Sequence, residues 1–526
     1  MVRVAGAVRP RLARAATAVR PRVARLARAA KPQLARVTRI ARDARVTPAK
    51  PGGTWWYTAG AATAGLALAA GAVTAAGPWD ATGQRTAERE WAVAQDGTGG
   101  ADHGRGPAAD ASAGPRPAPS APAVLTGLGG TATTVKSAPD GKPLAAVLGP
   151  LLSDPALGTR HGAAVVDAAT GRRLYGDGAG TPLTPASTTK IATAVAVLTA
   201  LGPDHRLTTR AALEPDTGEL VLVGGGDPTL TARRKAGGWA SLRTLAVDTA
   251  AALKKRGIDH VTLSYDTTLF ARPALHPIGV NSNLALVTAL AADEGRTDGS
   301  THGPAPRAAD PAADATRRFG GFLAEHGITA SAPGPSKATG RAETLATVSS
   351  PPLSAVVERM LTNSDNDIAE ALARQTALAT GERADFTGAG KAVRSRLSRL
   401  GLPITGAVFK DGSGLNRADK LTPNLLTALL AEAGDPAHPE LRPVLTGLPI
   451  AGFTGTLTSR HMDGTAGVVR AKTGTLTGVN TLAGTVVDQD GRLLAFAFLA
   501  SNTTDPYAAQ RALDAVATAL AGCGCG

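Results

Sequence analysis

The feature that most restricts how this chain can fold is a run of 23 residues, Trp55–Gly77, without one charged side chain. As a helix rising about 1.5 Å per residue, this run is long enough to cross a bilayer core of roughly 30 Å. Aromatic residues begin the run (Trp55–Tyr57) and follow it (Trp79), as is typical of side chains at a membrane interface. The sequence therefore predicts one transmembrane helix over residues 55–77.

Positive charge is concentrated before this span. Residues 1–50 contain 14 Lys and Arg and one acid, Asp43, so they carry +13 of the net charge of +14. Such a leader stays in the cytoplasm, and we expect a single-pass protein of the cell membrane with an extracellular catalytic body. Because the charge lies on a tail and not on a folded face, no nucleic-acid partner is expected. Small residues around Val73–Ala75 leave signal-peptide cleavage, and hence secretion, as the alternative.

Residues 78–140 are rich in Ala, Gly, Pro, Ser, Thr and Asp and contain few large apolar side chains. Such a segment buries too little surface to offset its chain entropy, so we predict a disordered stalk. At the other end of the chain, Cys523 and Cys525 are too few for a disulfide framework or a zinc site. We assign these two cysteines no role.

The two ends of the remaining chain predict parts of one sheet. Residues 163–167 and 173–175 predict a β-hairpin, and three further strands are expected at 468–472, 481–487 and 493–500. A helix over 186–201 is apolar on nearly every face and should be buried. A final helix carries one apolar stripe, formed by Leu513, Val516, Ala517 and Leu520. These patterns predict an α/β fold with an antiparallel sheet flanked by helices.

The middle of the chain has strand and helix signals of its own, at 220–223, 241–254 and 260–265. We therefore predict that residues 141–206 and 348–526 form one domain. Residues 207–347 would form a smaller domain inserted into it.

Most familiar sequence routes to hydrolysis are missing. The chain contains no Gly-x-Ser-x-Gly and no His-Glu-x-x-His, and its nine His residues lie at spacings unsuited to a metal. Gly224–Gly226 are followed by Asp227 and Pro228, which excludes a phosphate-binding loop and favours a packing or turn role.

Ser187 and Lys190 stand three residues apart at the start of the predicted buried helix, so their side chains share one helical face. A serine hydroxyl becomes a good nucleophile when a base takes its proton, and a lysine can be that base when desolvation lowers its pKa. The free N–H groups of a helix start also favour developing negative charge. Taken alone, the same pattern is more often a helix cap followed by a surface lysine.

Two more motifs follow in order. Ser364-Asp365-Asn366 comes after an amphipathic helix at 353–361, and Lys472-Thr-Gly-Thr475 ends a predicted strand near the C-terminus. Ser-x-Asn alone is usually a turn, and Asp365 is expected to stabilise its loop. Three such motifs in this order make coincidence a poor explanation.

Together these motifs resemble the signature of penicillin-binding proteins and class A β-lactamases. Further stretches resemble the D-alanyl-D-alanine carboxypeptidase/endopeptidase family with an inserted domain: Pro185–Lys190, Val223–Leu230, Asp411–Arg417, Gly455–Leu457 and Lys472–Leu476. The resemblance covers roughly residues 144–520. It implies the penicillin-binding/β-lactamase-like transpeptidase fold.

The resemblance also implies a role for each motif. Ser187 would be the nucleophile and Lys190 its proton acceptor. Ser364 would relay a proton to the leaving D-alanine, and Asn366 would bind the substrate amide and orient Lys190.

For the Lys-Thr-Gly motif, the resemblance implies that Lys472, Thr473 and Thr475 bind the terminal carboxylate of a D-Ala-D-Ala peptide. The backbone N–H groups of Ser187 and Thr475 would form the oxyanion hole. The implied partners are peptidoglycan stem peptides as substrates and β-lactam antibiotics as acylating inhibitors. No metal or organic cofactor is needed.

A β-lactamase or an esterase of the same superfamily is the alternative. A class A β-lactamase needs a separate deacylating glutamate, and Glu358 lies just before Ser364, which is the wrong place. The long insertion between Ser187 and Ser364 also speaks against it. A non-catalytic cell-wall-binding protein of the same fold is disfavoured by the intact motifs.

Overall fold

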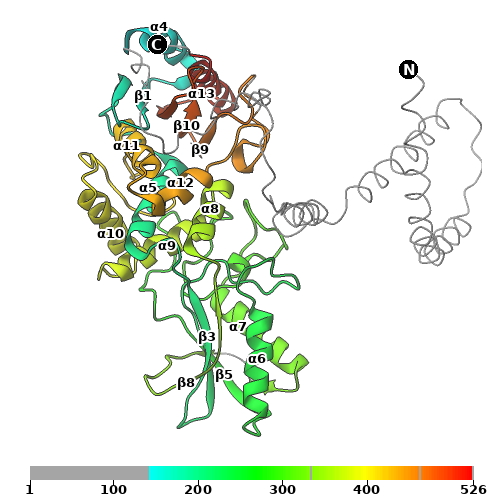
Figure 1. Cartoon of the computed structure of the whole chain (residues 1–526). Helices are drawn as coiled ribbons and strands as arrows, with labels where there is room; N and C mark the ends of the chain where they lie inside the picture. Colours follow the sequence, from blue (N-terminus) through cyan, green and yellow to red (C-terminus); the bar gives the residue numbers. More distant parts are fainter. Residues whose placement is uncertain (1–140, 332–333, 461, 463, 524–526) are drawn as a thin grey trace, which may run out of the picture. The chain divides into compact units, whose positions relative to one another are not determined.

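The computed structural model describes residues 141–331, 334–460, 462 and 464–523 (Figure 1). The predicted basic leader, membrane span and stalk therefore lie outside the described residues. Within the described residues, no helix combines the length and apolarity needed to cross a membrane.

A five-stranded antiparallel sheet joins the two ends of the described chain, in the order β2-β1-β11-β10-β9. Its strands are β1 (Arg160–Asp167), β2 (Arg173–Asp177), β9 (Arg470–Leu476), β10 (Val479–Val487) and β11 (Leu493–Ser501). The predicted hairpin and three C-terminal strands are thus confirmed. Strand β9 begins later than predicted and continues through the whole Lys-Thr-Gly motif.

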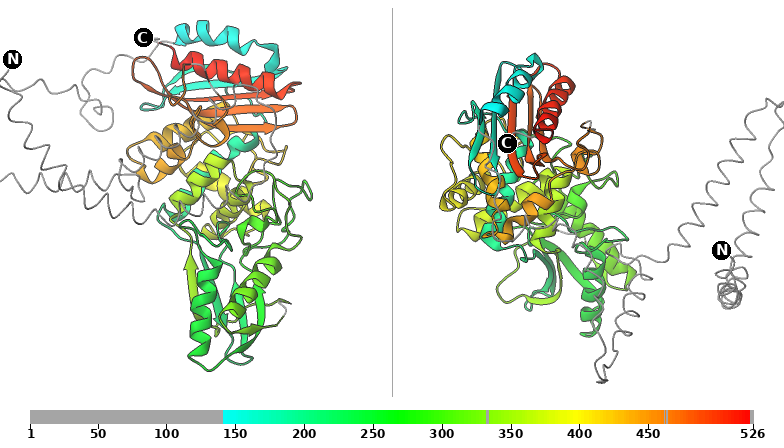
Figure 2. Two further views of the ribbon diagram at one scale, coloured as in Figure 1. Left: turned by 90° about the vertical axis from the view of Figure 1, so that its right-hand side faces the viewer. Right: turned by 45° about the horizontal axis from the view of Figure 1, so that its top comes forward.

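The central strand β11 shows why both faces of this sheet are covered. Its side chains alternate: Phe496 and Phe498 belong to one core, and Ala497 and Leu499 belong to another. The first core is closed by α4 (Gly141–Leu152) and α13 (Pro506–Ala521), which lie together on one face in Figures 1 and 2. A sheet buried on both faces needs nearly continuous apolar strands, and the sequence of β11 is apolar up to Ser501.

The second core is closed by a larger group of helices around α5. They are α5 (Thr189–Leu201), α8 (Leu353–Asn363), α9 (Asn366–Ala379), α10 (Phe386–Arg399), α11 (Pro423–Gly434) and α12 (Arg442–Thr446). The first ten residues of α5 are buried, as predicted. A short 3₁₀ turn, η3 (Ala186–Thr188), leads into α5.

A second sheet, with a core of its own, occupies residues 208–349. Its strands are β3 (Thr208–Leu213), β4 (Glu219–Val223), β5 (His260–Asp266), β6 (Thr329–Ala330), β7 (Gly334–Pro335) and β8 (Glu343–Ser349), and α6 (Leu242–Lys254) and α7 (Pro311–Glu325) complete the core. Strands β4 and β5 are parallel, whereas β3 pairs antiparallel with both β4 and β8. The domain boundaries at 207 and 347 stay a prediction.

Residues 267–310, here called the bridging segment, connect β5 to α7 with only one short 3₁₀ turn, η4 (Asp293–Gly295). Apolar side chains of this segment, Phe270 among them, pack against Phe386 of α10. The guanidinium of Arg374, almost fully buried in α9, donates to the carbonyls of Ala271 and Pro273. The inserted part of the chain is thereby held against the helices that surround α5.

Candidate active site

A cavity of about 430 Å³ is lined from three directions. Strand β9, the junction between α8 and α9, and the bridging segment each contribute to its wall. Five of the seven predicted site residues line it: Ser187, Ser364, Asn366, Thr473 and Thr475. The other two, Lys190 and Lys472, are fully buried.

The amine of Lys190 lies among three oxygen atoms. Its Nζ donates to Asn366 Oδ1 and to the Ser413 carbonyl, each at 2.7 Å, and lies 2.9 Å from Ser187 Oγ. The side-chain oxygen of Asn366 and the carbonyl oxygen of Ser413 can only accept hydrogen bonds. When the amine is neutral, its two N–H groups serve these two acceptors, and its lone pair is left for the Ser187 hydroxyl. This arrangement suits a base that takes the proton of Ser187.

Burial explains how Lys190 can lose its proton. Desolvation lowers the pKa of this amine to about 8, although the carboxylates of Asp411 and Glu370 act in the opposite direction. Asp365 and Asp367 also favour the ammonium form, more weakly. Desolvation therefore outweighs four carboxylates in this site.

The Ser364-Asp-Asn366 motif forms the junction between two helices. Ser364 ends α8 in the left-handed conformation, with φ of 57°, which is uncommon for a residue with a side chain. Asp365 begins α9 by accepting the Ile368 N–H at 3.0 Å. This contact agrees with the expected loop-stabilising role of Asp365, although Asp365 lines the cavity together with Ser364 and Asn366.

The side-chain amide of Asn366 is held at both ends. Its Oδ1 accepts from Lys190, and its Nδ2 donates to the Asn283 carbonyl of the bridging segment at 2.9 Å. The second contact fixes which end of the amide faces the lysine.

Strand β9 lies unusually close to the turn that carries Ser187. A Cβ atom on Gly474 would lie 2.1 Å from Thr481 Oγ1 and 2.7 Å from the Pro185 carbonyl, so glycine is required at this position. Thr481 also donates to the same carbonyl at 2.9 Å. This close approach brings Thr475, which is exposed, into the cavity with Ser187.

Lys472 lies on β9 and has no exposed surface. Burial, and then the positive charge of Lys190, lower the pKa of Lys472 well below its ordinary value. Its Nζ donates to the Thr473 carbonyl at 2.8 Å, and the Thr473 hydroxyl donates to Thr456 at 2.8 Å. Lys472 therefore needs a nearby anion to favour its charged form.

The Asp411–Gly414 stretch is buried, and it also holds the lysine. The Glu370 carboxylate accepts from the N–H groups of Gly412 and Ser413, while Asp411 accepts from Ser413 and Gly414. The Ser413 carbonyl is left facing Lys190. The other glycine motif is closely packed, because a Cβ on Gly225 would lie 1.7 Å from the Thr208 carbonyl oxygen.

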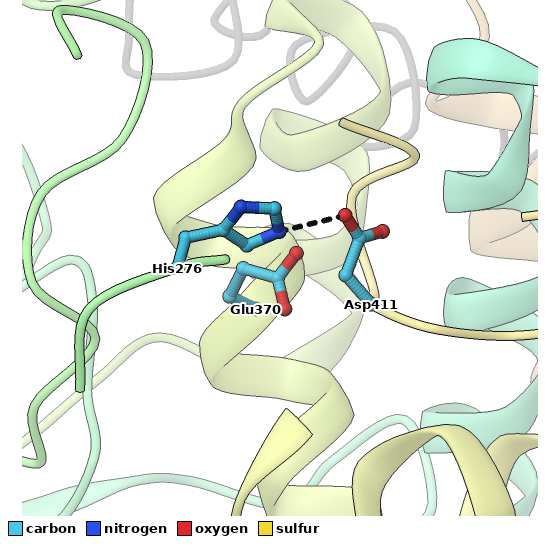
Figure 3. A group of neighbouring side chains, drawn as sticks. All are labelled: His276, Glu370 and Asp411. Carbon is cyan, nitrogen blue, oxygen red and sulfur yellow. Dashed lines mark hydrogen bonds and ion pairs between the residues drawn. The ribbon is translucent and has the colours of Figure 1, made fainter. Parts of the chain in front are cut away.

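Two residues that the sequence patterns do not indicate, His276 and Glu370, lie beside Asp411 (Figure 3). His276 Nε2 lies 2.9 Å from Asp411 Oδ2, and both side chains are almost fully buried. Burial raises the pKa of Glu370 to about 7, and the Asp411 charge adds to this effect. No motif marks these two residues, because they act on the turn and not on the cavity.

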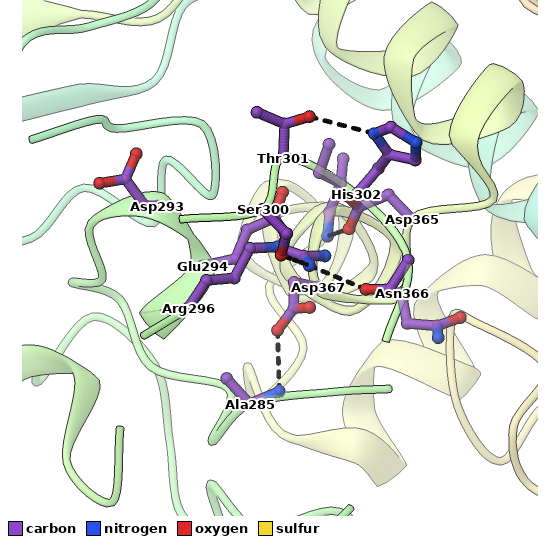
Figure 4. A network of polar contacts seen from close by, with 12 residues as sticks. Ala285, Asp293, Glu294, Arg296, Ser300, Thr301, His302, Asp365, Asn366 and Asp367 are labelled. Atoms are coloured by element: carbon purple, nitrogen blue, oxygen red, sulfur yellow. Dashed lines mark hydrogen bonds and ion pairs between the residues drawn. The ribbon is translucent and has the colours of Figure 1, made fainter. Parts of the chain in front are cut away.

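A second acidic group, Glu294, Asp365 and Asp367, lies where the bridging segment meets α9 (Figure 4). Asp367 accepts from the Ala285 N–H at 2.9 Å and pairs with Arg307 at 2.9 Å. Glu294 pairs with Arg296 at 2.7 Å, and burial raises the pKa of Glu294 well above its ordinary value. Two of the three carboxylates, those of Glu294 and Asp367, are thus paired with arginines in a structural network.

Comparison with known proteins places the chain in a family. The sequence pattern described as "D-Ala-D-Ala carboxypeptidase 3 (S13) family" matches residues 144–296 and 294–521. The chain belongs to this family. It is 37% identical over 424 residues to a carboxypeptidase of Mycobacterium tuberculosis, a match that covers 78% of this chain and 90% of that protein.

Two further matches agree with this assignment. The D-alanyl-D-alanine carboxypeptidase of an Actinomadura species is 31% identical over 461 residues, covering 70% of this chain and 83% of that protein. The crystal structure of penicillin binding protein 4 (DacB) from Haemophilus influenzae aligns with a TM-score of 0.56 at 22% identity, covering 69% of this chain and 94% of that one. The structural match confirms the predicted penicillin-binding fold.

The β-lactamase alternative finds no support in the cavity. Glu358 accepts from Thr446 of α12 at 2.5 Å, and no glutamate is among the described residues that line the cavity.

The lowered pKa of Lys190 predicts how acylation of Ser187 depends on pH. If the neutral amine is the base, the rate should rise about tenfold per pH unit up to the pKa of about 8 and level off above it. Stopped-flow acylation by a chromogenic penicillin across this range measures the profile. A rate that falls as the pH rises through this value would contradict the assignment, and Lys190→Ala should abolish the dependence along with most of the rate.

Proposed function

We propose that this member of the family is a serine-type D-alanyl-D-alanine carboxypeptidase/endopeptidase that cleaves peptidoglycan stem peptides through an acyl-enzyme. The observation that carries the proposal is the contact of the buried Lys190 amine with Ser187 Oγ at 2.9 Å, next to a cavity lined by the other two motifs.

The first step acylates the serine. Lys190 takes the proton of Ser187, and Ser187 Oγ forms a bond to the carbonyl carbon of the penultimate D-alanine. The negative charge that develops on the carbonyl oxygen is met by the N–H groups of Ser187 and Thr475. Strand β9 is the edge strand of its sheet, so one row of its backbone groups faces away from β10.

The second step releases the terminal D-alanine. The proton held by Lys190 passes through the Ser364 hydroxyl to the leaving amine as the C–N bond breaks. Water then attacks the ester and regenerates Ser187. In a cross-linked peptide the leaving amine belongs to a neighbouring stem, so the same chemistry gives endopeptidase activity.

Recognition of the peptide's end is assigned to β9. Thr473 and Thr475 line the cavity, and the buried Lys472 lies next to them on the same strand. A substrate carboxylate there supplies the anion that restores the charge of Lys472. A penicillin carries a comparable carboxylate, and this likeness supports acylation by β-lactams.

We further propose that residues 55–77 anchor the protein in the cell membrane and place the catalytic body outside the cell. Support comes from the charge-free run and the basic leader before it, and from a polymer substrate that lies outside the membrane.

Replacing the nucleophile tests the proposal directly. The full-length protein should label with a fluorescent penicillin and release D-alanine from pentapeptide fragments, whereas Ser187→Ala should do neither, because it lacks the hydroxyl that contacts Lys190. Labelling is read on gels and turnover by mass spectrometry. Ser153→Ala, at an exposed serine outside the cavity, is the matched control. Labelling that persists in Ser187→Ala would remove Ser187 from its role.

Lys472 tests the recognition of a carboxylate. A charge-assisted contact contributes about 1.5–3 kcal/mol, so Lys472→Ala should slow acylation by a D-Ala-D-Ala peptide roughly ten- to a hundredfold. The same peptide amidated at its C-terminus should already react slowly with the native protein and should change little. Equal losses for both donors would instead indicate that Lys472 only orders the site.

The anchor has its own test. A reporter fused after residue 140 should be active outside the cytoplasm, because the basic leader keeps the N-terminus inside. Cell fractionation should recover the full chain with membranes, and deletion of residues 55–77 should remove it from them. A fusion active only in the cytoplasm would contradict both the localisation and the substrate.

A further inference from the structure

Two chains of hydrogen bonds connect the bridging segment to Lys190. We propose that this segment positions the catalytic lysine: His276 holds the turn that presents the Ser413 carbonyl, and Asn283 holds the Asn366 amide. These two groups are the hydrogen-bond acceptors of Lys190. The inference rests on the proposed role of Lys190 as the base.

The first route runs through His276. Its Nδ1 accepts the Ile278 N–H at 3.2 Å, so the ring proton is on Nε2 and is donated to Asp411 Oδ2 at 2.9 Å. Asp411 in turn accepts from the N–H groups of Ser413 and Gly414. His276 is thus two hydrogen bonds away from the residue whose carbonyl accepts from Lys190.

The second route runs through the backbone of Asn283. Its carbonyl accepts from Asn366 Nδ2 at 2.9 Å, which leaves Oδ1 to face Lys190. Without this acceptor, the Asn366 amide could turn over and present its NH₂ group to the amine. Two residues later, the Ala285 N–H donates to Asp367 at 2.9 Å (Figure 4), which keeps the segment in place against α9.

The segment is itself held firmly enough to act as a support. Before His276, Arg374 donates to the carbonyls of Ala271 and Pro273, each at 2.8 Å. The His276 ring also meets the Phe386 ring edge-on, with centroids 5.1 Å apart. A buried donor fixed from both sides can hold Asp411 in a single position.

A metal site made of His276, Glu370 and Asp411 is a rival interpretation of Figure 3. However, both Glu370 oxygens accept backbone N–H groups, both Asp411 oxygens do the same, and both ring nitrogens of His276 are engaged. Each potential ligand atom of this group therefore already has a hydrogen-bond partner among the described residues. The arrangement therefore fits a structural role, in which His276 and Glu370 hold the Asp411–Gly414 stretch in place.

The chemical consequence concerns the direction of the lone pair on Lys190. With both N–H groups bound to fixed acceptors, the lone pair faces Ser187 Oγ. If either acceptor turns away, the amine can rotate and lose this alignment. Substrate binding in the cavity would be nearly unaffected, because His276 is not among the described residues that line it.

The test compares three variants of the full-length protein in their acylation by penicillin. His276→Leu removes the donor, His276→Gln keeps a donor at a similar distance, and His260→Leu changes an exposed histidine at the start of β5. We expect His276→Leu to lower the first-order acylation rate about ten- to a hundredfold with a change of less than about twofold in the dissociation constant of the initial complex. His276→Gln should recover most of the rate, and His260→Leu should match the native protein.

All rates are referred to folded protein at a temperature below the unfolding transition, and the acylated residue is mapped to Ser187. Equal losses in His276→Leu and His276→Gln, or a loss confined to the dissociation constant, would overturn the proposal. A ¹⁵N NMR spectrum of His276 in the native protein gives a test that needs no variant. Protonation on Nδ1 alone would remove the donor to Asp411 and overturn the proposal as well.

Failure of this positioning proposal can be distinguished from failure of the proposed function. Persistent labelling of Ser187→Ala would refute the serine mechanism itself. A native acylation rate in His276→Leu, with labelling still dependent on Ser187, would refute only the positioning role.

Discussion

The arrangement of the site depends on one buried amine. Lys190 has no exposed surface, and burying a charged amine is costly unless it is paired or loses its proton. Here three oxygens surround the amine, and nearby carboxylates offset part of the cost. Desolvation still prevails and brings the pKa to about 8. The pKa of the lysine therefore lies in a range where the amine can exchange a proton with Ser187.

Each oxygen around Lys190 comes from a different part of the fold. Ser187 lies one turn before it, Asn366 begins α9, and Ser413 lies in the turn after α10. The glycine of β9 allows that strand to approach the turn carrying Ser187. The bridging segment closes the remaining side. The bridging segment is therefore part of the wall of the site.

Much of the fold could be predicted because local patterns of apolar residues in the sequence indicate it. The unbroken apolar run from Phe496 to Leu499 predicts a strand that is covered on both faces. The helix after Ser187 is apolar on all sides, which predicts that it is buried. The bounds of β9 were harder to predict from the sequence, because Lys-Thr-Gly has no strong strand preference. This motif is held in the sheet by pairing with β10. Glu370 and Asn283 were missed because they act on or through backbone groups. His276 was missed because the side chain that it contacts, Asp411, lies 135 residues away in the chain.

The sequence by itself determined the reactive pair, since the i, i+3 spacing of Ser187 and Lys190 brings them together where the 3₁₀ turn η3 continues into α5. It also determined the apolar helix whose burial lowers the pKa of Lys190. Only the tertiary structure decided where the lysine's remaining hydrogen bonds go. Asn366 and Ser413 are 176 and 223 residues away in the chain, and His276 and Asn283 reach them through a segment without regular structure. Such contacts depend on how separate elements pack, and no local pattern encodes that packing.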